Sequence, residues 1–279
     1  MKLGITAFLT DETIMPDRLA TAVEDRGFAS LFLSEHSNIP ASRRTPYPET
    51  PDGVLPHGLY RLMDPFIALT AAAMSATSIT LGTAVTLIAQ RDVVYLAKEI
   101  ATLDVLSGGR LEIGVGAGWN IEELEVHGVD TKTRGDRLLE QVRALREIWS
   151  HDPAEFHGEH IDFEPIHSWP KPVSIEGPPI FLGALSRAAL ARVVELQAGW
   201  MPSALVITTE ELTRKRDWFA AQGIRDIRIK VYGADDDKAR LEVMRAGGVE
   251  EALLHIGDQP ESQMLHTLDR FASLVDHFA

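Results

Sequence analysis

Residues 107–119, SGGRLEIGVGAGW, hold the pattern that decides the fold. A serine and two glycines mark the end of a helix and a turn, and then bulky apolar residues alternate with Glu112, Gly114 and Gly116. This period of two predicts a strand that has one bulky face and one nearly bare face. Glycine weakens a strand, so it is placed where something must approach the backbone closely. Two explanations stay open: a cofactor ring lies against the strand, or the glycines relieve crowding inside a packed barrel.

Working outward from this stretch, strand patterns alternate with helix patterns along the whole chain. The expected strands cover residues 2–7, 30–35, 79–86, 111–116, 179–183, 199–203, 227–231 and 251–256. Helix start signals stand between them, including a proline after Asp64 and a capping pair at Thr208 and Glu211. Eight strand and helix pairs predict an α/β fold, a (β/α)8 TIM barrel with insertions, formed as one domain by residues 1–279.

Two segments do not fit the strand and helix alternation. Residues 37–61 are rich in Pro, Gly, Arg and His, and they are too many for an ordinary connection after a strand. Residues 156–163, with Gly158 at the turn, read as a small hairpin. Long insertions in such barrels usually cover a site, so we expect residues 37–61 to do so.

The composition excludes several classes of partner. There are 27 Lys and Arg residues against 41 Asp and Glu residues, a formal net charge of −14, which argues against nucleic acid and anionic membrane surfaces as partners. The chain has no cysteine, so it forms no disulfide or thiolate metal site, and its 10 histidines show no H-x-H or H-E-x-x-H spacing. No apolar stretch is long enough to span a bilayer. We expect a cytoplasmic protein without a metal.

The period-two pattern also predicts, for each strand, which side chains face into the barrel. Toward the carboxyl ends of the strands, where barrel enzymes place their sites, the inward set is small or polar. It consists of Gly4, Thr6, Ser34, His36, Gly82, Ala84, Gly114 and Gly116.

Charged residues also fall on inward positions. Arg228 and Lys230 have the inward phase on the seventh strand, and Glu112 has it on the fourth. A buried ion network is the favoured interpretation, because an unpaired interior charge costs several kcal/mol. The alternative is that Lys230 binds an anionic ligand.

Several stretches, taken together, resemble one family, the luciferase-like flavin and deazaflavin oxidoreductases, and within it the branch that uses coenzyme F420. The matching stretches follow one another in order over most of the chain. They are SEHSNIP (34–40), LGTAVT (81–86), SGGRLEIGVGAGWNIEELEVHG (107–128), WPKP (169–172) and PPIFLGALSRAALARVVELQAGWMP (178–202).

The resemblance implies a luciferase-like barrel in which strand three supports the tricyclic ring of the cofactor. It places a non-prolyl cis peptide between Ala84 and Val85, behind the ring, and leaves the opposite ring face for substrate and hydride. Gly116, Ala117 and Gly118 would line the edge of the ring.

The resemblance also implies a phosphate site where a strand end meets a helix N-terminus. It would consist of Gly183, Ala184, Leu185 and Ser186, where backbone N–H groups and the helix dipole favour an anion. Alanine replaces the usual second glycine at position 184. Trp119 is expected either to pack in the core or to wall the substrate cleft.

The candidate catalytic residues are His36 and Glu35, which the resemblance places beside the ring. From the residues alone, His36 is either a structural histidine or a group that hydrogen-bonds the cofactor or moves a proton. Glu35 is either part of a surface ion pair or a site residue. Arg43, Arg44 and His57 either attract an acidic cofactor tail or are solvated loop charges.

The function that follows is an F420-dependent oxidoreductase that transfers a hydride between the deazaflavin and a small organic substrate. Two alternatives are an FMN-dependent monooxygenase of the same superfamily and a barrel that binds a flavin without catalysis. The resemblance further implies a homodimer.

Overall fold

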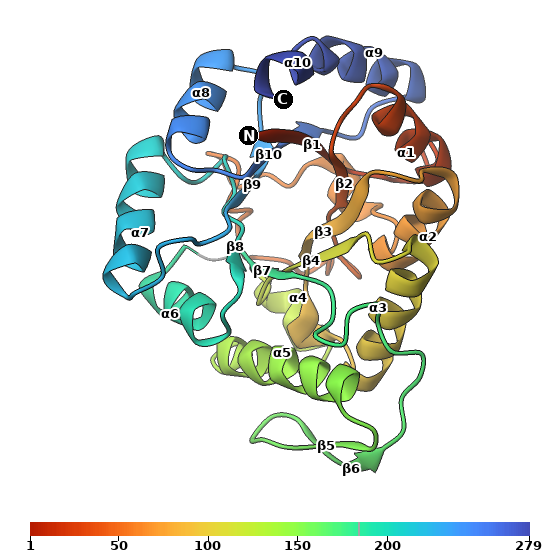
Figure 1. Ribbon diagram of the computed structural model, residues 1–279, viewed down its shortest axis with the longest axis vertical. Coiled ribbons are helices and arrows are strands. Elements are labelled where there is room, and N and C mark those ends of the chain that lie inside the picture. Colours follow the sequence, from red (N-terminus) through yellow and green to blue (C-terminus); the bar gives the residue numbers. More distant parts are fainter. Residues whose placement is uncertain (184) are drawn as a thin grey trace.

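Eight parallel strands form the centre of the molecule in the computed structural model, which describes residues 1–183 and 185–279. The order in the sheet is β8-β7-β4-β3-β2-β1-β10-β9, and isolated bridges from Trp200 to Ile229 and from Ser203 to Tyr232 join its two edges. The expected (β/α)8 barrel is therefore confirmed (Figure 1). Its strands are β1 (Lys2–Ala7), β2 (Ser30–Leu33), β3 (Thr80–Thr86), β4 (Leu111–Val115), β7 (Ile180–Leu182), β8 (Gly199–Trp200), β9 (Lys230–Ala234) and β10 (Glu251–Ile256).

Helices surround the strands as a ring, and the chain termini lie close together at one side of it (Figure 1). The outward faces of the strands pack against these helices in one large apolar core. The helices are α1 (Pro16–Asp25), α2 (Pro65–Ser75), α3 (Val93–Ser107), α4 (Ile121–Val126), α5 (Arg134–Ser150), α6 (Arg187–Glu195), α7 (Thr209–Ala221), α8 (Lys238–Ala246), α9 (Glu261–Ala272) and α10 (Val275–Phe278), with short 3-10 turns η1 (His57–Tyr60) and η2 (Ile88–Gln90). Among the described residues, no helix is both long enough and apolar enough to cross a bilayer.

The local signals read from the sequence act as expected. Asp64 accepts hydrogen bonds from the N–H groups of Phe66 and Ile67, and Thr208 forms the capping box with Glu211. The expected hairpin is formed by β5 (Ala154–His157) and β6 (Asp162–Ile166), which pair antiparallel outside the barrel.

One local expectation needs correction. The seventh strand begins at Lys230, three residues later than expected, because before it only Ile229 pairs, through an isolated bridge to Trp200. Helix α4 follows directly after the central stretch, with the acidic sequence IEELEV.

The middle of the barrel is filled by large side chains. Phe32, Phe181, Met201 and Leu253 pack there with Ala84. These side chains explain why most inward positions are glycine, because a larger residue there would collide with them. A Cβ atom on Gly82 would lie 2.4 Å from the Phe32 ring, and one on Gly114 would lie 2.7 Å from the sulfur of Met201. For these two glycines the crowding explanation is correct.

The amino-terminal end of the barrel is closed by an ion network. Lys230 pairs with Glu112 and Glu251, and the hydroxyl of Ser30 donates to Glu251 at 2.6 Å. Burial lowers the pKa of Lys230, but the two carboxylates outweigh it and raise that pKa overall. The expected buried network is confirmed, and it leaves Lys230 away from the carboxyl ends of the strands.

Candidate functional site

A cavity of about 740 Å³ lies at the carboxyl ends of the strands, within the usual size range of ligand sites. The strand ends form its floor, and the inserted residues 37–61 contribute Tyr47, Glu49 and Leu59 to its wall. Every described residue predicted for the site lines this cavity, namely Glu35, His36, Ala84, Val85, Gly116, Ala117, Gly118, Gly183, Leu185 and Ser186. Ala184 lies outside the described residues.

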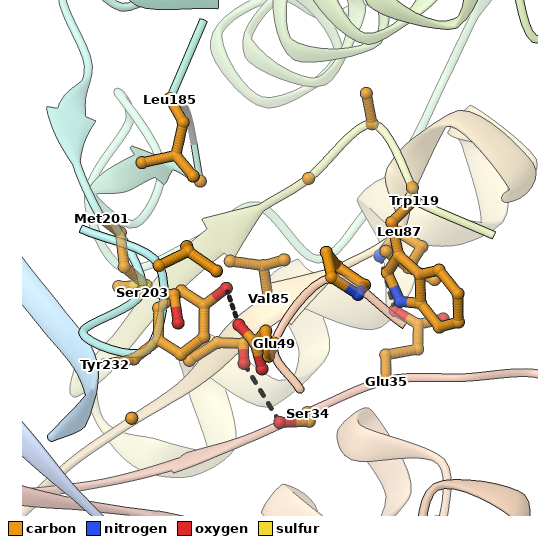
Figure 2. A pocket seen from close by; sticks show the side chains of 18 of the residues that line it. Ser34, Glu35, Glu49, Val85, Leu87, Trp119, Leu185, Met201, Ser203 and Tyr232 are labelled. Atoms are coloured by element: carbon orange, nitrogen blue, oxygen red, sulfur yellow. Dashed lines mark hydrogen bonds between the residues drawn. The ribbon is translucent and has the colours of Figure 1, made fainter. Parts of the chain in front are cut away.

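Val85 forms the centre of the cavity floor, with Leu185 and Met201 to one side and Leu87 and Trp119 to the other (Figure 2). A cis peptide joins Ala84 and Val85, as the resemblance implies. Glycines flank Val85 on the next two strands: a Cβ atom on Gly116 would lie 2.7 Å from Val85, and one on Gly183 would lie 3.2 Å from it. Positions 116 and 183 therefore place no side chain beside Val85, and the apolar side chain of Val85 lines the cavity between them.

His36 is held between an acid and an indole. Its Nδ1 atom lies 2.6 Å from a carboxylate oxygen of Glu123, and the Nε1–H group of Trp119 donates to its Nε2 atom at 3.2 Å. Only 6% of the His36 side chain is exposed, so these two partners fix the ring. The network assigns the proton to Nδ1, because Nε2 accepts a hydrogen bond. His36 thus orients Trp119 at the wall of the cavity.

Glu123 gathers several donors around its buried carboxylate. Besides His36, it accepts from the N–H group of Ser37 at 3.0 Å and from the side chain of Gln90 at 3.0 Å. Burial raises the pKa of Glu123, but the hydrogen bonds from His36, Gln90 and the Ser37 N–H group lower it below its ordinary value. This carboxylate ties helix α4 to the end of strand β2.

Glu35 turns its carboxylate toward the end of strand β3. It accepts from Arg91 Nε at 2.7 Å, from the N–H group of Leu87 at 3.0 Å and from the hydroxyl of Thr86. Arg91 also pairs with Asp64 at 2.7 Å. Glu35 is therefore a buried anchor for Thr86 and Leu87, the two residues that follow Val85. Its ion pair with Arg91 is buried, whereas one of the two sequence-based interpretations was a surface ion pair.

The inserted residues 37–61 are fastened over the cavity by helix α4. Glu122 accepts from the N–H group of Arg44 at 3.1 Å and from the hydroxyl of Thr45 at 2.8 Å. The hydroxyl of Thr45, together with backbone N–H groups, lowers the pKa of Glu122 to about 2. Tyr47 and Leu59 then pack against Phe8 at the end of strand β1.

The remaining end of the cavity is basic. Ser186 caps helix α6 by accepting from Ala189 N–H at 3.2 Å, and Lys132, Arg134 and Arg192 line the cavity with it. Arg43, Arg44 and His57 do not line it, so the solvated interpretation fits those three loop residues.

A polar group from the insertion also lines the cavity. Glu49 accepts from Tyr47 at 2.5 Å and from Tyr232 at 3.1 Å, the second bond being drawn in Figure 2. His255 lines the same cavity, 3.4 Å from the hydroxyl of Thr6. Burial lowers the pKa of His255, although the charge of Glu49 acts in the opposite direction, so a neutral imidazole is favoured there.

A family model described as luciferase-like monooxygenase matches residues 17–258 of the chain. The chain belongs to this family. An uncharacterised protein of Mycobacterium tuberculosis is 34% identical over 280 residues, which cover 98% of each chain. The luciferase-like fold expected from the sequence is thus confirmed.

Two solved structures share the fold of this luciferase-like chain at low sequence identity. The monooxygenase RslO1 from Streptomyces bottropensis superposes with a TM-score of 0.79 at 20% identity, and the match covers 100% of both chains. An F420-dependent secondary alcohol dehydrogenase, solved with an F420-acetone adduct, superposes with a TM-score of 0.76 at 16% identity and covers 99% of this chain and 98% of that one.

Several residues of the candidate site were not expected from the sequence. They lie in the insertion, in the helices α4, α5 and α6 and the segment before α5, or at strand positions whose inward phase was not followed to the strand end. They are Glu49, Glu123, Lys132, Arg134, Arg192, Tyr232 and His255. For His255 the signal was present, because it continues the inward phase of Glu251 and Leu253 on strand β10.

Proposed function

We propose that the protein is an F420-dependent oxidoreductase that transfers a hydride between the deazaflavin and a small organic substrate. The observation that carries the proposal is the cavity floor, where the apolar side chain of Val85 lies between Gly116 and Gly183, two cavity-lining positions that carry no side chain. A planar tricyclic ring needs such an apolar support on one face. When bound, the cofactor supplies the hydride chemistry, while the protein supplies position and electrostatics.

The residues around the floor have distinct tasks in this proposal. Val85 supports one ring face, Gly116 to Gly118 line the ring edge, and the start of helix α6 at Ser186 receives the phosphate. Lys132, Arg134 and Arg192 offer positive charge to further acidic groups of the cofactor. Three cations beside one phosphate site favour F420, whose tail carries more acidic groups than FMN does.

The two candidate catalytic residues receive different roles. His36 lines the cavity and is proposed to reach the reacting molecules by exchanging the Trp119 N–H group at its Nε2 atom for a hydrogen bond to them. Glu35 is proposed as a positioning residue, because its carboxylate holds Arg91 and the backbone of Leu87. It acts on the cofactor through the shape of the strand end that carries Val85.

The second candidate function is an FMN-dependent monooxygenase. The family description and the fold likeness to a monooxygenase favour it, and the same floor accommodates an FMN ring. A barrel that binds a flavin without catalysis is the third candidate. The proposal also includes a homodimer in the cytoplasm, which light scattering and cell fractionation would test.

A titration of the purified protein with F420 and with FMN separates the candidates. We expect saturable binding of F420, seen in its absorbance and fluorescence, followed by hydride transfer with at least one member of a substrate panel. Binding of FMN alone would contradict the proposal and favour the monooxygenase. Binding of F420 without transfer to or from any substrate would favour the non-catalytic barrel.

A further inference from the structure

The carboxylate of Glu49 lies in the cavity, and its hydrogen-bond partners among the described residues are two tyrosine hydroxyls rather than a positively charged group. The hydroxyls of Tyr47 and Tyr232 both donate to Glu49, one from the inserted residues 37–61 and one from strand β9. Figure 2 draws the bond from Tyr232. Burial, followed by the negative charge of Glu49, raises the pKa of both tyrosine hydroxyls, so that both stay protonated and donate. The carboxylate is therefore fixed in direction from two sides.

None of the ion pairs within residues 1–183 and 185–279 includes Glu49. The other acid that lines the cavity, Glu35, is neutralised by Arg91 at 2.7 Å. Arg192, one of the basic lining residues, already pairs with Asp136 at 2.8 Å. A partly buried carboxylate without a counter-charge is unfavourable, so its position in a ligand cavity calls for a positive partner from outside the chain.

Aromatic rings surround the space beside Glu49. The ring of Tyr47 lies edge-on to Trp119 with centroids 5.3 Å apart, and Phe8 and Tyr232 line the same cavity. The faces of such rings attract cations, and a carboxylate beside them adds direct charge attraction. His255 adds no competing positive charge, because its pKa is lowered by burial.

We propose that Glu49, together with Tyr47, Tyr232 and Trp119, binds a positively charged nitrogen of the substrate, so that the substrate class is small organic amines. This inference rests on the proposed function, because it places the substrate on the side of the cavity that faces the floor at Val85. Each oxygen of Glu49 accepts from one phenol, Oε2 from Tyr47 and Oε1 from Tyr232, so the ammonium group donates to the second lone pairs of these oxygens. The aromatic rings replace the water that the cation loses.

The test compares two probes of equal shape, benzylamine and benzyl alcohol, with the protein alone and with the protein saturated with cofactor. Binding is measured by calorimetry or ligand-observed NMR, so no turnover is needed. We expect benzylamine to bind at least about tenfold more tightly than benzyl alcohol. Glu49→Gln, which keeps the size and removes the charge, should abolish this preference. Asp52→Asn, an exposed change in the same insertion, should leave it unchanged.

Equal affinity for the two probes, tighter binding of the alcohol, or no measurable binding of the amine overturns the inference. A preference for the amine that survives in Glu49→Gln overturns it as well. Titration of Glu49→Gln with F420 and FMN separates this outcome from failure of the proposed function. The variant should bind cofactor as the unaltered protein does, since Glu49 is not among the residues assigned to the cofactor.

Discussion

Replacing Lys230 by methionine should destabilise the barrel strongly and leave the cavity intact. Only 3% of the Lys230 side chain is exposed, and it neutralises Glu112 and Glu251 at the amino-terminal end of the strands. Loss of one partner of a buried ion pair costs about 3 to 5 kcal/mol, because the other charge stays buried without compensation. The expected loss lies near the middle of that range.

The neighbours of Lys230 explain this middle value. Arg228 remains 2.9 Å from Glu112 and continues to neutralise it, whereas Glu251 keeps only the hydroxyl of Ser30. We therefore expect the free energy of unfolding to fall by about 4 kcal/mol, which corresponds to roughly 8 °C in melting temperature for a chain of this size. Urea denaturation and thermal melting both measure the change.

A matched control is Lys2→Met, which removes an exposed lysine from strand β1 at the same end of the barrel. Its effect should stay within about 0.5 kcal/mol. Stability of Lys230→Met equal to that of this control would refute the reasoning. Weaker cofactor binding by Lys230→Met without loss of stability would instead support the anionic-ligand alternative.

Three further predictions concern the site. Glu35→Ala should lower the free energy of unfolding by about 2 kcal/mol, because the Leu87 N–H group loses its buried acceptor while Arg91 keeps Asp64 and Glu99 as partners. Lost turnover with an unchanged melting temperature would instead indicate a direct catalytic role. Gly116→Val should weaken F420 binding at least about tenfold, because the new valine side chain would press on Val85 in the cavity floor. Unchanged F420 affinity in the titration would contradict the assignment of Val85 and Gly116 to the cofactor site. Burial lowers the pKa of His255 below its ordinary value of 6.5, so as the pH drops below 6.5 the unfolded chain is protonated first and the free energy of unfolding falls. In urea denaturation across that pH range, His255→Asn should show a flatter dependence of stability on pH. An identical slope in the variant and the unaltered protein would contradict this prediction.

The barrel could be predicted because each strand carries its own signal. Eight alternating segments separated by helix caps leave few other arrangements, and the capping residues mark the boundaries. The glycines show the limit of this reasoning. Gly114 and Gly116 look equivalent in the sequence, yet Gly114 makes room for the Thr83 carbonyl and Met201 inside the barrel, whereas Gly116 makes room for Val85 and lines the cavity. The difference depends on side chains from other strands.

The site could be predicted in part, for a similar reason. His36 and the floor residues stand at strand ends, where the phase of the strand gives their direction. Glu49 and Glu123 come from an irregular insertion and a short acidic helix, and nothing local shows that Glu123 is almost completely buried. Their partners Tyr232 and His36 lie far away in the sequence, so only the folded path of the chain brings them together.

The most direct test of the account is a crystal structure of the protein with F420 bound. The account predicts that one face of the deazaflavin ring rests on Val85, with its edge along Gly116 and its phosphate at Ser186. A ring bound elsewhere, or the floor at Val85 covered by side chains while F420 is bound, would contradict it.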